Sequence, residues 1–246
     1  MREFQSVLLI GGTSEIGLGV IRSLARRGTR DIALLARDSN GLQISTAKLV
    51  SESPESMVHS YVIKSDISSQ VEKLIQVLKP ELVVISIGQM ANQREIENNP
   101  NLIHSLNAGN VDIPVMALLA TVNSFERLGK GSIAVFGSVA GDRGRSINYV
   151  YGAGKAFLET ICQGLWQRIQ GTEIQLTLVK PGPTETKMSR QIHRSRVKLA
   201  SVDQVSEVIV EGILSGRSVV YAPRFWRYIM KIVVLLPNYV FNRLHF

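Results

Sequence analysis

Short apolar runs alternate with longer amphipathic segments along most of the chain. The runs are rich in Val, Ile and Leu and are typical of buried strands, whereas the segments between them carry apolar residues at helical spacing. Gly28 and Pro80 follow two of these segments and mark where helices end. The predicted strands cover residues 7–10, 32–35, 58–64, 82–87, 132–136, 174–179 and 219–221, and the predicted helices cover 16–24, 68–78 with Ser68 as N-cap, 103–128, 151–169 and 201–214.

This alternation predicts an α/β fold. Strands joined by helices form a parallel sheet, and nearly continuous apolar strands suit a sheet that is covered on both faces. We therefore expect a Rossmann-type doubly wound parallel sheet of about seven strands with helices on both faces. The alternation runs through one domain, residues 1–224, and an apolar and basic tail follows over residues 225–246.

The composition narrows the class of protein. The chain has 246 residues, of which 45% are hydrophobic, and its single cysteine, Cys162, excludes an internal disulfide and favours a cytoplasmic, reducing compartment. Cys162 falls in a helical segment, where a buried apolar role is more common than a nucleophilic one. The net charge of +8 favours anionic partners but does not choose among phosphates, nucleic acid and membrane. We predict no signal peptide, no membrane-spanning segment and no metal site.

A glycine-rich turn joins the first predicted strand to the first helix. Glycine allows close approach of a phosphate, and the helix N-terminus presents free N–H groups to it. A tight turn without a ligand is the alternative. Glu15 is an unusual residue beside a pyrophosphate, and we expect its side chain to face solvent. The candidate cofactor contacts are Gly11, Thr13, Ser14, Glu15, Ile16 and Gly17.

The ends of the second and third strands bear on the choice of cofactor. Ala36 stands where an NAD-selective site carries an acid, and Arg37 follows it, which favours NADP(H) over NAD(H). Asp38 keeps NAD(H) open, and Arg37 is alternatively an ordinary surface charge. Asp66 is placed to bind the adenine amino group, with helix capping or a loop position as its alternative.

Tyr151 and Lys155 are four residues apart and share one face of a predicted helix. A neighbouring ammonium favours tyrosinate, so we expect Lys155 to lower the pKa of Tyr151 toward neutral pH. Ser138 follows the fifth strand and is positioned to hold the oxygen of a substrate to which Tyr151 gives a proton. The alternative is a surface pair without a catalytic role.

These motifs, in this order, resemble the short-chain dehydrogenase/reductase family. The resemblance covers about the first 190 residues. It implies a nicotinamide-dependent oxidoreductase that forms a homo-oligomer, in which Asn107 joins Ser138, Tyr151 and Lys155 in a proton relay. One departure is that Ser86-Ile87-Gly88-Gln89 replaces the family's Asn-Asn-Ala-Gly turn and keeps only the glycine. The further cofactor contacts that the resemblance implies are Ile67, Gly88, Tyr151, Lys155, Pro181, Gly182, Thr184 and Thr186.

Four segments resemble more closely the reductases that serve decaprenylphosphoryl-ribose 2-epimerases. They are residues 9–17 (LIGGTSEIG), 140–143 (AGDR), 148–152 (NYVYG) and 221–228 (YAPRFWRY). The resemblance implies reduction of a 2-keto pentose on a polyprenyl phosphate, in cell wall biosynthesis, after a flavin-dependent oxidase partner has formed the ketone. The substrate contacts would be Ser138 and Tyr151, with Arg143 and Arg145 on the phosphate. The alternative for both arginines is a solvated basic loop.

Two segments remain open in function. Residues 184–199 are polar and basic and are a substrate lid or a mobile loop. The tail surrounds a short apolar run with aromatic and basic residues, which suits a helix in the interface of a membrane, at its cytoplasmic face; docking on the domain or on a second copy is the alternative.

The sequence leaves two other functions open. One is a soluble reductase of another carbonyl, such as an acyl chain, a steroid or a free sugar. The other is a non-catalytic nicotinamide-binding regulator, against which the complete set of Ser138, Tyr151 and Lys155 argues. No sequence signal of a nucleic-acid-binding protein is present, so no nucleic acid partner is expected.

Overall fold

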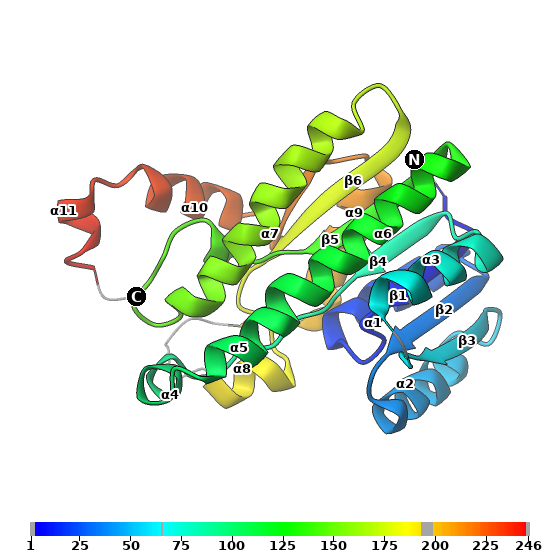
Figure 1. The fold of residues 1–246 in the computed structure, drawn as a ribbon, viewed down its shortest axis with the longest axis horizontal. Helices are drawn as coiled ribbons and strands as arrows, with labels where there is room; N and C mark the ends of the chain where they lie inside the picture. Colours follow the sequence, from blue (N-terminus) through cyan, green and yellow to red (C-terminus); the bar gives the residue numbers. More distant parts are fainter. Residues whose placement is uncertain (1–2, 65, 193–198, 245–246) are drawn as a thin grey trace.

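The computed structural model describes residues 3–64, 66–192 and 199–244, with the side chains of 190–192 left out. Its centre is one parallel sheet of seven strands in the order β3-β2-β1-β4-β5-β6-β7 (Figure 1). The chain therefore crosses from one half of the sheet to the other between β3 and β4, as the doubly wound fold requires. The strands are β1 (Ser6–Ile10), β2 (Asp31–Ala36), β3 (Met57–Val62), β4 (Leu82–Ile85), β5 (Lys130–Phe136), β6 (Glu173–Pro181) and β7 (Val219–Ala222).

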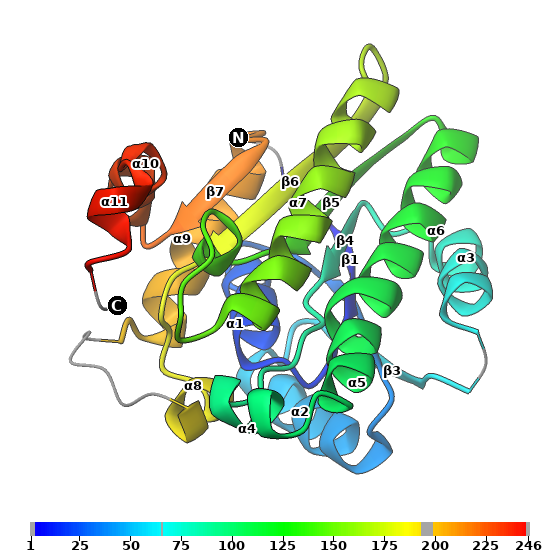
Figure 2. The same cartoon turned by 60° about the vertical axis from the view of Figure 1, so that its left-hand side comes forward.

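Helices cover both faces of the sheet. α1, α2 and α9 lie on one face, and α3, α6 and α7 lie on the other (Figure 2). The helices are α1 (Glu15–Ala25), α2 (Ser39–Glu52), α3 (Ile67–Leu78), α4 (Gln93–Asn98), α5 (Leu102–Asn107), α6 (Ile113–Leu128), α7 (Tyr149–Arg168), α8 (Lys187–Ile192), α9 (Val202–Leu214), α10 (Trp226–Leu235) and α11 (Asn238–Phe241), with a π-helical turn η1 (Ala108–Asp112) and a 3₁₀ turn η2 (Val139–Gly141).

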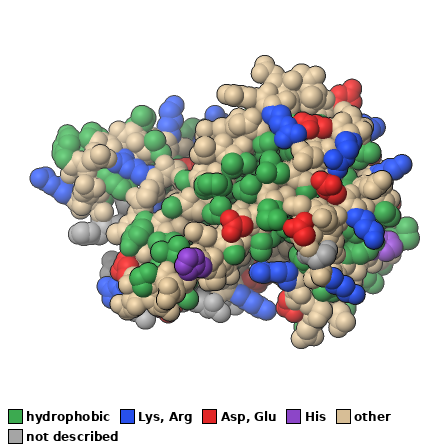
Figure 3. All heavy atoms as spheres, viewed as in Figure 1, with side chains coloured by type: hydrophobic (Ala, Val, Ile, Leu, Met, Phe, Trp, Pro, Cys, Tyr) green, Lys and Arg blue, Asp and Glu red, His purple; other side chains and the backbone are tan. Residues whose placement is uncertain are grey.

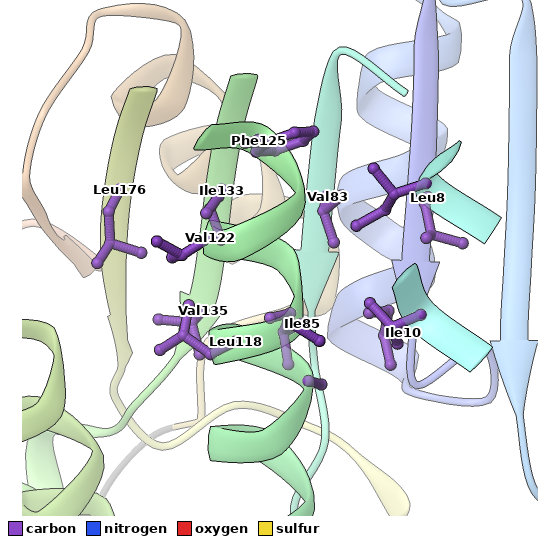
Figure 4. Packing of buried hydrophobic residues seen from close by; sticks show 14 of the residues in the cluster. Leu8, Ile10, Val83, Ile85, Leu118, Val122, Phe125, Ile133, Val135 and Leu176 are labelled. Atoms are coloured by element: carbon purple, nitrogen blue, oxygen red, sulfur yellow. The ribbon is translucent and has the colours of Figure 1, made fainter. Parts of the chain in front are cut away.

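The core has two halves because side chains of a strand alternate between the faces of the sheet. In β1, Leu8 and Ile10 pack toward α3 and α6, whereas Val7 and Leu9 pack toward α1 and α9. Figure 4 shows the first half, where residues of α6 such as Phe125 lie against β1, β4 and β5. β4 pairs in parallel with both β1 and β5. The carboxyl ends of these three strands therefore lie side by side at one edge of the sheet, the carboxyl edge.

All seven predicted strands are confirmed, and three features of the helices differ from the prediction. α2, α4 and α8 lie in segments for which no helix was predicted. The N-cap of α3 is Asp66 and not Ser68, because the Asp66 carboxylate accepts the backbone N–H of Ser69 at 2.9 Å. The long helix predicted over residues 103–128 is continuous in direction but contains η1 between α5 and α6.

Two further predictions concern burial. The stretch Leu102–Leu128 is long and apolar enough to cross a membrane by length and composition alone, but half of its apolar window is buried in the fold, where α6 packs on α3. Cys162 is fully buried in α7, and burial raises the pKa of its thiol to about 12, which leaves it a packing residue at neutral pH.

Candidate active site

The predicted residues Ser138, Tyr151 and Lys155 come together at the carboxyl edge of the sheet. Ser138 follows β5 directly and begins η2, where its Oγ accepts the backbone N–H of Ala140 at 3.1 Å. Tyr151 and Lys155 lie one turn apart on α7, with the Lys155 Nζ 5.8 Å from the centre of the Tyr151 ring. The Tyr151 hydroxyl is close enough to Ser138 for a side-chain hydrogen bond.

Lys155 is a buried ammonium held by backbone carbonyls. Its side chain is 3% exposed, and Nζ donates to Phe136 O at 2.9 Å and to Ile87 O at 3.4 Å. Burial lowers the pKa of Lys155 to about 8, because two carbonyl dipoles do not replace the water that the charge has lost. The group therefore titrates close to physiological pH.

The prediction that Lys155 lowers the pKa of Tyr151 is wrong for this structure. Burial raises the pKa of the phenol above its usual value, and the hydrogen bond with Ser138 opposes that rise only in part. The expected effect required an ammonium in contact with the phenol oxygen, whereas the carbonyls of Phe136 and Ile87 hold the Lys155 Nζ beneath the strand ends. The Tyr151 phenol is therefore protonated at neutral pH and can act as a proton donor.

The structure places Asn110, and not the predicted Asn107, beside Lys155. Asn107 is exposed at the end of α5. Asn110 is 2% exposed, lies in η1, and pairs with the backbone of Gln89 through Oδ1 (3.0 Å from N) and Nδ2 (2.8 Å from O). A Cβ on Gly88 would lie 3.2 Å from both Asn110 Oδ1 and Lys155 Nζ, so the three residues converge on one point.

The glycine-rich turn has the geometry that the sequence predicted. Gly11 has a φ of +101°, and a Cβ there would lie 2.3 Å from Ser86 O, so only glycine fits against the end of β4. Ser14 caps α1 by accepting the Gly17 N–H at 3.2 Å, and its Oγ is 2.7 Å from that of Ser86. The turn is thereby fixed to β4 with the N-terminus of α1 open above it.

Glu15 does not face solvent as predicted. Its half-buried side chain turns toward α8, where Oε2 accepts the backbone N–H of Lys187 at 2.6 Å. The carboxylate thus ties α1 to the start of α8.

Arg37, Asp38 and Asp66, which were expected around the adenosine half, are exposed. Arg37 and Asp38 follow β2, and the Asp38 carboxylate caps α2 by accepting the Gly41 N–H at 3.1 Å. Asp66 caps α3 through one carboxylate oxygen, so the capping alternative is confirmed for it. Ile67 is buried at the start of α3, and Thr13 is exposed beside the turn.

The predicted nicotinamide side lies between β6 and α10. Pro181 ends β6, and the Gly182 N–H donates to Ala222 O at 2.9 Å. A Cβ on Gly182 would lie 2.2 Å from Trp226 Nε1, so the indole at the start of α10 rests on this glycine. Thr184 is buried and its hydroxyl donates to Gly182 O at 2.9 Å, while the Thr186 hydroxyl lies 3.3 Å from Ser189 Oγ. Residues 193–198 of the predicted lid lie outside the described residues.

Arg143, which was predicted to meet a substrate phosphate, is engaged with the C-terminal segment in this structure. Its Nη1 donates to Val233 O at 2.5 Å and to Leu236 O at 2.7 Å, and its Nη2 donates to Asn238 Oδ1 at 2.9 Å. The guanidinium also lies 3.8 Å from the centre of the Phe241 ring. Arg143 therefore binds the C-terminal end of α10, whose last carbonyls need donors.

Arg145 is the other residue that was predicted to meet a substrate phosphate. It is half-buried, and its Nε is enclosed without a hydrogen-bond partner in the described part of the protein. Burial lowers the pKa of Arg145, and the charge of Asp142 opposes that effect. Gln93 Nε2 and Asn148 Oδ1 are also enclosed and unpaired in the described residues. Gln93 reaches the start of α7, where its Oε1 accepts the Val150 N–H at 3.2 Å.

A buried ionic cluster below this loop was not predicted. Lys180 Nζ lies 2.6 Å from Asp142 Oδ1 and 2.5 Å from Glu159 Oε1, and the Tyr221 hydroxyl donates to Asp142 Oδ2 at 3.0 Å. Burial disfavours the charge on Lys180, but the two carboxylates outweigh it and raise the lysine pKa. The cluster ties the loop after Ser138 to β6, β7 and α7. Lys180 and Tyr221 lie 38 and 79 residues from Asp142 along the chain, so no local sequence motif predicts the cluster.

The described residues contain no cluster of potential metal ligands.

Comparison with known proteins agrees with this geometry. The sequence pattern of the family described as short chain dehydrogenase matches residues 5–197. An uncharacterised oxidoreductase of Streptomyces coelicolor is 30% identical over 243 residues, which cover 98% of this chain and 96% of the relative.

Two solved structures share the fold and were determined with a nicotinamide cofactor. A short-chain dehydrogenase from Sphingobium yanoikuyae in complex with NADPH has 22% identity and a TM-score of 0.75, with 95% of this chain and 97% of that chain covered. One from Burkholderia cenocepacia in complex with NADP has 19% identity and a TM-score of 0.78, with 96% and 100% covered.

Proposed function

Because the chain belongs to the short-chain dehydrogenase/reductase family and is an NAD(P)-dependent oxidoreductase, we propose that it reduces a ketone to a secondary alcohol. The observation that carries the proposal is the convergence of Ser138, Tyr151 and Lys155 at the carboxyl edge of the sheet. A phenol whose pKa is raised keeps its proton until an acceptor arrives, which suits a reductase more than a dehydrogenase at neutral pH.

The residues present fit a dinucleotide. Gly88 leaves open the approach to the Lys155 ammonium, where a Cβ would come within 3.2 Å of Nζ, and Gly11 keeps the turn free of side chains. The N-terminus of α1 would hold the pyrophosphate, and Lys155 and Gly182 would hold the nicotinamide half. The cofactor, when bound, supplies the hydride.

The protein's own residues manage the proton. Ser138 would hold the carbonyl oxygen by a hydrogen bond, and the Tyr151 hydroxyl would give its proton to that oxygen as negative charge develops. Lys155, protonated below pH 8, would stabilise the tyrosinate that remains. Asn110 would act as a positioning residue, because it joins the Gln89 backbone to η1 beside the Lys155 ammonium.

NADP(H) is the cofactor that we propose over NAD(H). Arg37 is exposed after β2 and makes no ion pair within the described residues, so it is available to a ribose phosphate. Asp38, which would favour NAD(H), already uses one carboxylate oxygen to accept the Gly41 N–H and cap α2. Arg37→Ala should raise the KM for NADPH about tenfold and leave that for NADH unchanged.

For the substrate, we propose the 2-keto group of a pentose linked to a polyprenyl phosphate. The support is the sequence of the tail and the unpaired Nε of Arg145 close to the loop that follows Ser138. Arg143 is engaged with the tail, so Arg145 alone is the phosphate contact in this proposal. A flavin-dependent oxidase that forms such a ketone would be the partner enzyme, and the chain would act as a homo-oligomer.

Turnover of purified protein tests both levels of the proposal. NADPH and then NADH are offered with a polyprenyl-phosphate 2-keto-pentose and, separately, with water-soluble ketones. Oxidation of NADPH with formation of the epimeric pentose lipid is expected. Turnover of soluble ketones alone would replace the lipid-linked substrate with another carbonyl. Tyr151→Phe should lose about 10³-fold in kcat while it still binds cofactor, and a variant that retains the wild-type rate would overturn the mechanism.

A further inference from the structure

The C-terminal segment presents an apolar face that the domain does not cover. α10 and α11 lie beside β7 and project from the end of the molecule (Figures 1 and 2). The inner side of α10 carries Trp226, Met230 and Val233, and Met230 is 2% exposed. These residues follow the spacing of one helix face and are sufficient to dock α10 on the domain.

A second apolar stripe lies on the opposite side of the same helix. Phe225, Tyr228, Ile232 and Leu235 follow at spacings of three or four residues and are exposed, Leu235 by 72% and Tyr228 by 69%. Tyr239 and Leu244 extend the exposed apolar surface beyond α10. Figure 3 shows hydrophobic and basic side chains gathered at this end of the molecule. We call the stripe on α10, together with Tyr239 and Leu244, the outer face.

The charges around the outer face have one sign. Residues 224–246 contain Arg224, Arg227, Lys231 and Arg243 and no Asp or Glu. Arg224 pairs with Glu211, whereas the other three make no ion pair in the described part of the chain. Arg217 and Arg227 also line a hollow of about 540 Å³ at the edge strand β7, together with the ion pair of Lys180 and Glu159.

We propose that the outer face docks on an anionic phospholipid bilayer. Exposed aromatic and aliphatic side chains enter the boundary between head groups and acyl chains, and the flanking basic side chains meet lipid phosphates. A second copy of the chain fits less well, because a symmetric contact of the outer face with itself would bring the unpaired basic residues together.

The docked segment is connected to the active site at two points. Trp226 rests on Gly182, and Arg143, five residues after Ser138, holds the end of α10. Membrane docking would therefore set the side of the site formed by the loop after Ser138 next to the bilayer, within reach of a lipid substrate. The docking itself does not depend on the proposed substrate.

Vesicle sedimentation of the full-length protein tests the proposal without any activity measurement. The probes are vesicles of phosphatidylcholine alone and vesicles that also contain phosphatidylglycerol. The test variant is Ile232→Glu with Leu235→Glu. The matched control is Ile44→Glu with Val77→Glu, which changes the net charge equally at apolar residues that are 63% and 69% exposed on α2 and α3.

We expect the wild-type protein and the control to sediment with the anionic vesicles only, and less so at high salt. The test variant should lose about tenfold or more of its partitioning. Three results would overturn the proposal: a wild-type protein that stays in solution, a test variant that sediments like the wild type, or an equal loss in the control. A smaller particle mass of the test variant in analytical ultracentrifugation would assign the outer face to a second copy instead. Cofactor binding checks that both variants are folded.

Discussion

Asn110 lies only three residues from Asn107, yet the two side chains have opposite environments. A regular helix would place residues 107 and 110 near one face, but η1 inserts an extra residue into one turn and rotates the chain between them. The spacing of residues in the sequence does not reveal a π-helical turn. The sequence therefore predicted an asparagine on this helix, and the prediction chose Asn107.

Paired substitutions separate the two asparagines. Asn110→Ala removes both bonds to the Gln89 backbone and leaves buried groups unpaired, so kcat should fall by about tenfold or more and the free energy of unfolding by about 2 kcal/mol. Asn107→Ala, at an exposed position, should change neither. Steady-state kinetics and urea unfolding measure the two effects, and equal activity of both variants would refute the assignment to Asn110.

The buried ammonium of Lys155 predicts an unusual pH dependence. Its pKa is about 8 in the folded protein and near 10.5 in the unfolded chain, so the unfolded state binds more protons between these values. The charge therefore costs the native state about 3 kcal/mol below pH 8, and this cost is relieved as the pH rises from 8 toward 10.5.

Lys155→Met makes this cost measurable. The variant should be the more stable protein at pH 7, and its advantage in free energy of unfolding should shrink between pH 8 and pH 10. Denaturant unfolding of both proteins across this range gives the difference. An advantage that does not vary with pH would mean that the pKa of Lys155 is the same in the folded and the unfolded protein. Reduction by the wild type should slow above pH 8 for the same reason, because less ammonium remains to stabilise the tyrosinate.

At the scale of elements, the strands were predictable because burial on both faces makes them continuously apolar. α2 was not predictable, because only two of its fourteen residues, Leu42 and Leu49, are buried. Its apolar residues therefore follow the helical spacing only weakly. The same limit applies to the site. The glycine turn and the pair of Tyr151 and Lys155 are local patterns, whereas the contact of Glu15 with α8 joins residues 172 positions apart.

The buried cluster of Asp142, Lys180, Glu159 and Tyr221 connects four elements and should contribute strongly to stability. Asp142→Asn leaves the Lys180 ammonium with one carboxylate in a site where its side chain is 4% exposed. We expect a loss of about 3 kcal/mol in the free energy of unfolding. Glu126→Gln is the control, because its bond to Arg168 is at the surface and should cost less than about 1 kcal/mol. Equal losses in urea unfolding would show that the cluster is no stronger than a surface pair.

On the scale of the whole molecule, Arg143 is the main polar link between the catalytic domain and the tail. Arg143→Met removes the donors to two carbonyls at the end of α10 and to Asn238 Oδ1 in α11, so α10 should open more often. Limited digestion with chymotrypsin, which recognises Tyr228 and Tyr239, should release the tail about tenfold faster. Arg243→Met, at an exposed residue, is the matched control. An unchanged rate for Arg143→Met would mean that apolar packing alone holds the tail.

The position of Trp226 on Gly182 also gives the protein an optical reporter. The chain has two tryptophans, and the other, Trp166, is half-buried against the core and is held by a hydrogen bond from its indole to Leu176 O at 2.9 Å. Emission from Trp226 arises beside the turn proposed to hold the nicotinamide, so a reduced cofactor should quench it by energy transfer more strongly than it quenches Trp166. In Trp166→Phe the remaining fluorescence would then follow cofactor occupancy and the seating of α10 in one signal, with no label added.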